Sequence, residues 1–307
     1  MVKKVLVIGG TYFYGRVFCM LAAREAGFEL TLINRGKYSM AHLPGVTEYR
    51  ADRHDAAALA AIPAGEYDAI VDFCAYTAGD VRFLLEHLRC KAEKYVFIST
   101  ADVCRRDLPQ PPDEDAPVLS EPLPGPVGDY LWNKILLERE LAEVCAQRGM
   151  NYTVFRPAFL YGPYNYAPRE NYFFEKIVRG EAIPAPTDAD ARFQFVYVKD
   201  AANAIIADIE AARGENAVYH LAAPERLDYA AFFEVLCRVC DRPVNTVPVT
   251  VQTVIAQNIP LPFPLTAAES ELFDGSRVCR ALGLCYTPIE EGMGKAYLAV
   301  KPVFEGQ

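Results

Sequence analysis

The sequence predicts an α/β protein in which a doubly wound parallel sheet is combined with a smaller, interleaved C-terminal lobe. Apolar, β-branched runs alternate with helical patterns from the first residues onward, which is typical of right-handed βαβ units. A glycine-containing turn directly follows the first apolar run, and after Gly162-Pro163 short helices and proline-rich turns replace the long strands. The 307 residues, 52% of them hydrophobic, are enough to bury a full α/β core.

The expected elements alternate along the chain. Strands are expected at Lys4–Ile8, Leu30–Ile33, Ala69–Asp72, Tyr95–Ile98, Tyr152–Phe155, Phe193–Val198 and Val218–Leu221. Helices are expected at Gly79–Arg89, Asp129–Arg148 and Asp200–Ala212. The proline-rich stretch from Leu108 to Pro126 interrupts this rhythm and is interpreted either as a functional loop over the strand ends or as a solvated excursion.

Charge and composition argue against a nucleic-acid-binding, membrane or metal-binding protein. The net charge of −9 and the pI near 5.1 repel a polyanionic backbone, so nucleic acid is a poor general partner. No apolar run approaches bilayer length and the chain enters a strand at once, so we expect a cytoplasmic protein without a membrane partner. The nine cysteines are expected to be reduced, and the Cys237/Cys240 pair lies in an expected helix without a second such pair, so we expect no metal site.

The turn after the first strand, Gly9-Gly10-Thr11-Tyr12-Phe13-Tyr14-Gly15, predicts a dinucleotide site. Gly9 permits a tight turn and Gly15 permits close packing of the following helix, whose N-terminus offers unpaired N–H groups to a pyrophosphate. The spacing departs from the G-x-G-x-x-G pattern, because Tyr12 replaces its middle glycine. An ordinary strand-to-helix turn is the alternative.

Two later positions bear on the choice of cofactor. The second strand ends in Asn34-Arg35-Gly36-Lys37, with two cations where a carboxylate would bind the ribose 2′-hydroxyl, so we expect NADP in preference to NAD. Exposed basic residues in a turn are the alternative. Asp52, after the third strand, either accepts a hydrogen bond from the adenine amino group or is a plain turn residue.

Tyr130 and Lys134 are the expected acid/base pair, chosen among three similar pairs by their position in the sequence. The pattern Tyr-x-x-x-Lys also occurs at Tyr172/Lys176 and Tyr297/Lys301. Only Tyr130 opens a helical stretch that lies beyond a strand ending in a hydroxyl pair, Ser99-Thr100. Residues four apart share one face of a helix, so Tyr130 and Lys134 can face one ligand above the strand end.

Hydride transfer at a carbinol carbon requires a proton donor and acceptor beside the nicotinamide. Free tyrosine has a pKa near ~10, which is too high for a base at neutral pH, but a close ammonium favours the phenolate. Lys134 supplies that charge and is also expected to hold the nicotinamide ribose. Thr100 can share its hydroxyl between Tyr130 and a substrate oxygen.

In these residues the chain resembles the extended branch of the short-chain dehydrogenase/reductases, the NAD-dependent epimerase/dehydratase family. The motifs that carry the resemblance are Gly9–Gly15, Asp52, Phe73–Tyr76, Ser99-Thr100, Tyr130/Lys134, Arg156–Pro163, Phe195–Asp200 and Leu282-Gly283. The Gly-Gly-Thr turn together with Asn34-Arg35-Gly36 is similar to an atypical subgroup that includes chloroplast stem-loop-binding proteins.

The resemblance implies a Rossmann-like fold and roles for individual residues. It implies that Thr100, Tyr130 and Lys134 form the catalytic triad. The candidate cofactor-binding residues are Gly9, Thr11, Tyr12, Phe13, Gly15, Asn34, Arg35, Asp52, Arg53, Phe73, Cys74, Ala75, Tyr130 and Lys134. The candidate substrate residues are Tyr76, Asp102, Phe159 and Arg192. Phe159 stands where many sugar-nucleotide enzymes have an asparagine, and Arg192 is one residue off the commonest spacing.

We therefore expect an NAD(P)-dependent epimerase or reductase that acts by hydride transfer at a carbinol carbon, with a nucleotide-linked sugar as substrate. The alternative is a cofactor-bound RNA-binding or regulatory protein without turnover. Residues 1–162, with 193–222 returning to the sheet, are assigned to the dinucleotide-binding domain, and residues 163–192 and 223–307 to the substrate lobe. The resemblance also implies a homodimer that pairs the helices at Gly79–Arg89 and Asp129–Arg148.

Overall fold

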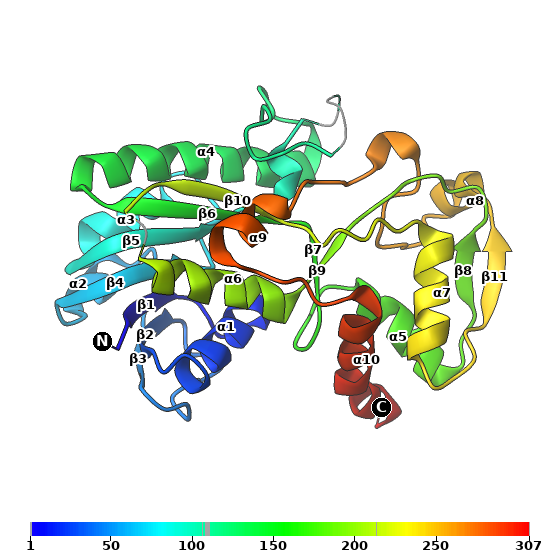
Figure 1. Ribbon diagram of the computed structural model, residues 1–307, viewed down its shortest axis with the longest axis horizontal. Helices are drawn as coiled ribbons and strands as arrows, with labels where there is room; N and C mark the ends of the chain where they lie inside the picture. The colour runs from blue at the N-terminus through cyan, green and yellow to red at the C-terminus, as the bar shows by residue number, and fades with distance from the viewer. Residues whose placement is uncertain (1, 106, 108–110, 213, 307) are drawn as a thin grey trace.

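The structure, a computed structural model, describes residues 2–105, 107, 111–212 and 214–306. Its larger part is a seven-stranded sheet with helices on both faces, and a smaller part of short strands and helices lies at one end (Figure 1). All neighbouring strands of the large sheet are parallel, in the order β10-β6-β5-β4-β1-β2-β3. These strands are β1 (Lys4–Ile8), β2 (Glu29–Asn34), β3 (Val46–Arg50), β4 (Gly65–Asp72), β5 (Cys90–Ile98), β6 (Asn151–Pro157) and β10 (Ala217–Leu221).

This order confirms the predicted fold class and locates its functional edge. From β1 the chain runs outward through β2 and β3, then returns to the other side of β1 with β4. In open parallel sheets, ligands bind outside the carboxyl ends of the strands at such a switch point. The glycine-rich turn that follows β1 therefore lies at the edge where a ligand is expected.

Helices cover both faces of the sheet because successive side chains of a strand point to opposite faces. Val5 and Val7 of β1 belong to one apolar core, and Leu6 and Ile8 belong to another. All four are at most 1% exposed, which explains why β1 is apolar without alternation. The first face is covered by α1 (Phe13–Arg24) and α6 (Val198–Ala211), and the second by α2 (Ala56–Ala61), α3 (Asp80–His87) and α4 (Gly125–Arg148) (Figure 1).

The smaller part has an aromatic interior. Its strands pair as β7 (Phe159–Tyr161) with β9 (Phe195–Tyr197) and β8 (Ile183–Pro186) with β11 (Thr246–Val249). Its helices are α5 (Glu170–Arg179), α7 (Tyr229–Val239), α8 (Val251–Ala256), α10 (Ile289–Glu305) and the 3-10 turn η2 (Ala267–Glu269). The rings of Phe193 and Phe263 stack with centroids 4.8 Å apart, and both belong to the core that also holds α1 and α6. The two parts therefore share one continuous core.

One helix from the C-terminal region lies with the large sheet. The helix α9 (Ser276–Leu282) packs beside β10 and α6, although residues 223–307 were assigned to the substrate lobe (Figure 1). The division of the chain at residues 162, 192 and 222 stays a prediction.

Several predicted elements have different bounds in the structure, and two of these differences have a clear local cause. The strand expected at Phe193–Val198 is shorter, because Val198 already begins α6, whose first turn carries Asp200. The helix expected from Asp129 begins at Gly125, since Pro126 in the first turn has a backbone angle suited to a helix start. Val218–Leu221 returns to the large sheet as part of β10, next to β6.

Two contacts hold the proline-rich loop to neighbouring segments. Leu108, Pro109 and Gln110 lie outside the described residues. An antiparallel bridge joins Cys104 to Val118, and the Glu114 carboxylate accepts a hydrogen bond of 2.9 Å from the backbone N–H of His220 on β10. The short 3-10 turn η1 (Ala101–Val103) precedes this loop directly after β5.

Among the described residues, no helix has both the length and the apolar character that crossing a membrane requires. All nine cysteines are free thiols; Cys240 is buried and Cys237 is exposed. The cytoplasmic location stays a prediction.

Candidate functional site

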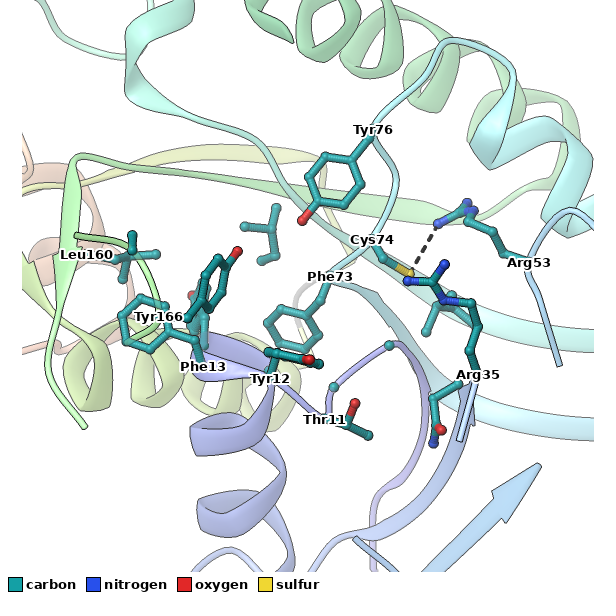
Figure 2. Close-up of a pocket in the computed structure, with 18 of the residues that line it drawn as sticks. Thr11, Tyr12, Phe13, Arg35, Arg53, Phe73, Cys74, Tyr76, Leu160 and Tyr166 are labelled. Atoms are coloured by element: carbon teal, nitrogen blue, oxygen red, sulfur yellow. Dashed lines mark hydrogen bonds between the residues drawn. The ribbon is translucent and has the colours of Figure 1, made fainter. Parts of the chain in front are cut away.

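A cavity of about 650 Å³ opens at the carboxyl edge of the large sheet. Its wall includes residues at or just after the ends of β1, β2, β4, β5 and β6, and it is completed by the β1–α1 turn, the start of α4 and the loop after β7. Figure 2 shows Tyr166 and Leu160 on one side of this cavity, Arg35 and Arg53 on the other, and Tyr12 between them. The cavity is therefore elongated between a basic end and an aromatic end.

The β1–α1 turn has the geometry that the sequence predicts for a pyrophosphate cradle. Gly9 and Gly10 have φ angles of 85° and 78°, which side chains rarely adopt. A Cβ on Gly15 would lie 2.6 Å from the Gly10 Cα atom, so the helix can approach the turn only with glycine at this position. The first turn of α1 carries no acidic residue and its N-cap Tyr12 makes no side-chain cap, which leaves N–H groups for an anion.

Tyr12 stands at the mouth of the cavity. Its ring is 40% exposed and lies 4.8 Å from the Tyr38 ring and 5.9 Å from the Tyr166 ring. The Lys37 ammonium lies 5.4 Å from the centroid of the Tyr12 ring and 5.6 Å from that of Tyr38. A hydrogen bond from Lys37 lowers the pKa of Tyr12, and the same bond raises the pKa of Lys37. Lys37 is thus held by aromatic rings.

Arg35 is the second cation of that turn and is directed differently. Asn34 orders the turn, because its side-chain oxygen accepts a hydrogen bond of 2.7 Å from the Gly36 N–H group. The Arg35 guanidinium lines the cavity and points toward the side where Cys74 lies (Figure 2). Both cations line the cavity, but Lys37 is held by the rings of Tyr12 and Tyr38.

Asp52 and Arg53 line the same end of the cavity and differ in their bonding. The Asp52 carboxylate is half-exposed and accepts a hydrogen bond of 2.9 Å from the His54 N–H group, as in a turn. Arg53 is buried and donates to both oxygens of Asp72 at 2.9 Å, while Tyr95 donates to Asp72 at 2.6 Å. The charge of Arg53 is therefore already balanced beneath the cavity.

Lys134 is fixed at the carboxyl ends of two neighbouring strands. Its ammonium donates hydrogen bonds of 2.8 Å to the Ala75 carbonyl, after β4, and to the Ile98 carbonyl of β5. It also lies 4.7 Å from the ring centroid of Tyr76 and 5.7 Å from that of Tyr130. Only 3% of Lys134 is exposed, and burial lowers its pKa to about 8.

Tyr130 lies on the same face of α4 and lines the cavity with Thr100. Desolvation, together with the nearby Asp102 carboxylate, raises the pKa of Tyr130 to about 12, and the charge of Arg169 opposes this rise. The Thr100 hydroxyl is 3.4 Å from an oxygen of Asp102 and 3.4 Å from its N–H group. In the protein alone the phenol is thus a neutral acid, and a base form requires further positive charge.

The two other Tyr-x-x-x-Lys pairs lie away from the cavity. Lys176 pairs with Glu181 at 3.0 Å and lies over the Tyr172 ring. Tyr297 and Lys301 both bind Asp241. Both pairs are ordinary contacts along a helix.

Four of the predicted site residues do not line the cavity. Ala75 is buried, and only its carbonyl contributes, through Lys134. Asp102 lies beside Thr100 in η1, and Phe159 packs against Phe263 with a centroid distance of 5.4 Å. Arg192 is exposed, and its backbone N–H donates to Ser270. The other predicted site residues line the cavity.

The cavity also includes residues to which the sequence analysis assigned no role. Ser99 Oγ is buried and has no hydrogen-bond partner among the described residues. Tyr166 and Arg169 come from the loop that follows β7. The Gly162-Pro163 turn at the end of a strand was the available signal for this loop.

Comparison with known proteins agrees with this architecture. Residues 77–222 match the model of the NAD dependent epimerase/dehydratase family. This segment of the chain is therefore similar to that family. The resemblance recognised in the sequence is confirmed by this match and by a curated relative, chloroplast stem-loop binding protein of 41 kDa b of Arabidopsis thaliana. That relative is 32% identical over 219 residues, which cover 66% of this chain and 54% of the relative's own length.

Solved structures support the fold described above. UDP-glucose 4-epimerase of Thermotoga maritima, with UDP-glucose, is 20% identical, with a TM-score of 0.74 over 98% of this chain and 100% of that one. UDP-glucose-4-epimerase of Stenotrophomonas maltophila, with NAD and formylated UDP-arabinopyranose, is 16% identical, with a TM-score of 0.77 over 99% of both chains. At these identities the likeness establishes the fold.

We predict that the Lys134 ammonium titrates near pH 8, whereas Lys37 titrates above the ordinary value of 10.5. Since the unfolded chain keeps the Lys134 proton up to about pH 10.5, this residue lowers the free energy of unfolding progressively as the pH falls from 10.5 through 8. NMR of protein labelled with ¹³C at the lysine side chains measures both midpoints, and Lys134→Arg assigns the signal. A midpoint of 10.5 for Lys134 would contradict the burial.

Proposed function

We propose that this protein is an NAD(P)-dependent epimerase or reductase that moves a hydride at the carbinol carbon of a nucleotide-linked sugar. The observation that carries the proposal is one cavity that joins the glycine turn after β1 to Thr100, Tyr130 and Lys134. The family match and the epimerase folds of the neighbours support the reaction class. Nucleotide sugars are proposed as substrates because those neighbours contain them.

The residues of the cavity fit a dinucleotide. The open N-terminus of α1 and the Gly10–Gly15 approach suit a pyrophosphate, which a side chain at Gly15 would displace. Arg35 and Asn34 would hold the adenosine ribose, with Asp52 near the adenine. Lys134 would hold the nicotinamide ribose. A bound NAD(P) would supply the acceptor and donor of hydride.

Tyr130 is proposed to exchange a proton with the substrate hydroxyl through its phenol oxygen. At neutral pH Lys134 is cationic, because its pKa is about 8, and its charge favours the phenolate of Tyr130. Thr100 Oγ1 would position the same hydroxyl from the strand end. Lys134 cannot leave this place without breaking two hydrogen bonds to backbone carbonyls, so its charge stays beside the reacting group.

Tyr130→Phe is expected to keep the fold and cofactor binding while lowering turnover at least about a hundredfold, as for the loss of a positioned acid/base. Tyr172→Phe is the matched control, because it also removes the hydroxyl of a Tyr-x-x-x-Lys pair on a helix. Turnover is measured with UDP-glucose and NAD⁺ or NADP⁺ by product NMR. Turnover that survives in Tyr130→Phe and is lost in Tyr172→Phe would overturn the assignment.

Arg35→Ala is expected to weaken NADPH binding more than NADH binding, by the ~1.5–3 kcal/mol of a hydrogen bond to a charged group. Lys37→Ala is the control and should discriminate less, since Lys37 is held by Tyr12 and Tyr38. Calorimetry with both cofactors gives the four affinities. Equal losses for NADPH and NADH in Arg35→Ala would show that Arg35 binds no 2′-phosphate.

The second candidate function, RNA binding without turnover, is favoured by the name of the Arabidopsis relative. Exposed tyrosines around the cavity, Tyr12, Tyr38, Tyr164 and Tyr166, would offer rings for unpaired bases. The net charge of −9 opposes binding of the phosphate backbone. Gel-shift with single-stranded RNA, together with a wild-type protein inactive on every nucleotide sugar, would favour this function over the enzyme.

We also propose a homodimer that pairs α3 and α4 with the same helices of a second copy. These helices pack side by side on one face of the sheet, and Glu140 of α4 accepts hydrogen bonds of 2.6 Å from the N–H groups of Gly79 and Arg82 (Figure 1). Helices that are joined in this way would pair with the same helices of a second copy about a two-fold axis. Light scattering is expected to give twice the chain mass of 34.1 kDa at micromolar concentration, and a value of 34.1 kDa would exclude the dimer.

A further inference from the structure

The loop of residues 162–169, between β7 and α5, forms the wall of the cavity opposite Arg35. Asn165, Tyr166, Ala167 and Arg169 line the cavity from this loop. Figure 2 shows Tyr166 and Leu160 at this side, away from Arg35. A ligand that extends from the β1–α1 turn past Tyr130 therefore meets this loop.

The loop has an unusual backbone that the fold holds in place. Gly162 has a φ of 127° and Tyr164 has a φ of 68°, in the region that side chains rarely adopt. Such conformations cost free energy and persist where the surrounding structure enforces them, often at ligand sites. They indicate that the positions of the loop side chains are specified.

A buried carboxylate enforces this conformation. Glu170 is 0% exposed and accepts hydrogen bonds from the Gly162 N–H group at 2.9 Å and from the Asn165 amide at 3.0 and 2.9 Å. Asn165 in turn accepts from the Ala167 N–H group at 2.9 Å, and Asn171 donates to the Asn165 carbonyl at 2.8 Å. The loop is thus built around Glu170, whose carboxylate is committed to these bonds.

Arg169 is the cation that this loop presents to the cavity. One guanidinium nitrogen donates to the Leu160 carbonyl at 3.0 Å, and the group lies 5.3 Å from the centroid of the Phe159 ring. Within the described part of the chain it forms no ion pair with a carboxylate. Since a guanidinium has five N–H donors in a planar fork, the remaining donors suit a carboxylate or a phosphate. A half-buried arginine without a counter-ion is unexpected in a protein of net charge −9.

Arg169 also acts on the proposed acid/base. Desolvation and the Asp102 carboxylate raise the pKa of Tyr130, and the positive charge of Arg169, which lines the same cavity, opposes this rise. An anion bound at Arg169 would place its ligand beside the Tyr130 phenol.

We propose that Arg169 binds an anionic group of the substrate, a carboxylate or a phosphate, and thereby fixes the substrate at Tyr130. This inference rests on the proposed function for the identity of the substrate as a nucleotide sugar. It gives Arg169 the role that the sequence suggested for Arg192, which is exposed and outside the cavity. Phe159, in the place of the expected asparagine, becomes the ring beneath the guanidinium.

Calorimetry with saturating NAD⁺ tests the proposal with two ligands. UDP-glucuronate carries a diphosphate and a sugar carboxylate, and UDP-glucose carries the diphosphate alone. Arg169→Gln is expected to weaken binding by roughly ten- to a hundredfold, the effect of losing a hydrogen bond to a charged group, and Arg169→Lys to restore part of it. Arg179→Gln, at the other end of α5 and paired with Glu175 at the surface, is the matched control.

The two ligands distinguish the source of the anion. Weakening for UDP-glucuronate alone identifies the sugar carboxylate, and equal weakening for both identifies the diphosphate. Unchanged affinities in Arg169→Gln, with the wild type binding either ligand, overturn the inference and leave the proposed function standing.

A second measurement distinguishes failure of the anion site at Arg169 from failure of the proposed function. Glucuronate and inorganic phosphate are titrated separately into the NAD⁺-loaded protein while NMR follows the side-chain N–H signals of Arg169, assigned with Arg169→Gln. We expect a saturable shift from at least one of the two anions. A saturable shift without binding of either nucleotide sugar supports the anion site and removes the proposed substrate. No saturable shift from either anion, together with no effect of Arg169→Gln, overturns the inference.

Discussion

The site depends on one buried ammonium. Lys134 extends from α4 to the carboxyl ends of β4 and β5. Its ammonium donates one hydrogen bond to the Ala75 carbonyl, just after β4, and one to the carbonyl of Ile98, the last residue of β5. These two bonds and the rings of Tyr76 and Phe97 offset the cost of desolvating a cation. Because Tyr130 is one turn away on α4, the same contacts fix where the phenol lies relative to the cavity.

A second buried charge supports the floor of the cavity at its other end. Arg53 and Asp72 form a buried ion pair that also receives the Tyr95 hydroxyl and the Cys74 N–H group. Asp72 ends β4, so this network fixes the segment that carries Cys74 and the Ala75 carbonyl. The Ala75 carbonyl in turn holds Lys134. The end of the cavity that holds Arg53 and the end that holds Lys134 are thus joined through the segment that follows β4.

The smaller part of the structure supplies the wall of the cavity opposite Arg35. Its loop after β7 is held by the buried Glu170, whose desolvation raises its pKa to about 7. The ring of Tyr166 from this loop reaches the rings of Tyr12 and Phe13 at the β1–α1 turn, at 5.9 and 6.4 Å. A ligand in the cavity is therefore enclosed by segments from both parts of the structure, which share one core.

The sequence by itself determined the parallel sheet, because strands buried on both faces must be apolar without alternation, as β1 is. It also determined which Tyr-x-x-x-Lys pair lies at the strand ends, since only Tyr130 follows a strand that ends in Ser99-Thr100. The order of residues along short segments was sufficient to predict both the sheet and this pair. The tertiary structure decided the contacts between residues that are far apart in the sequence. Arg53 is neutralised by Asp72, Lys37 is held by Tyr12, and Arg192 lies outside the cavity. It also decided that Arg169 lies inside, because the loop that carries it is shaped by a buried carboxylate whose partners no local pattern reveals.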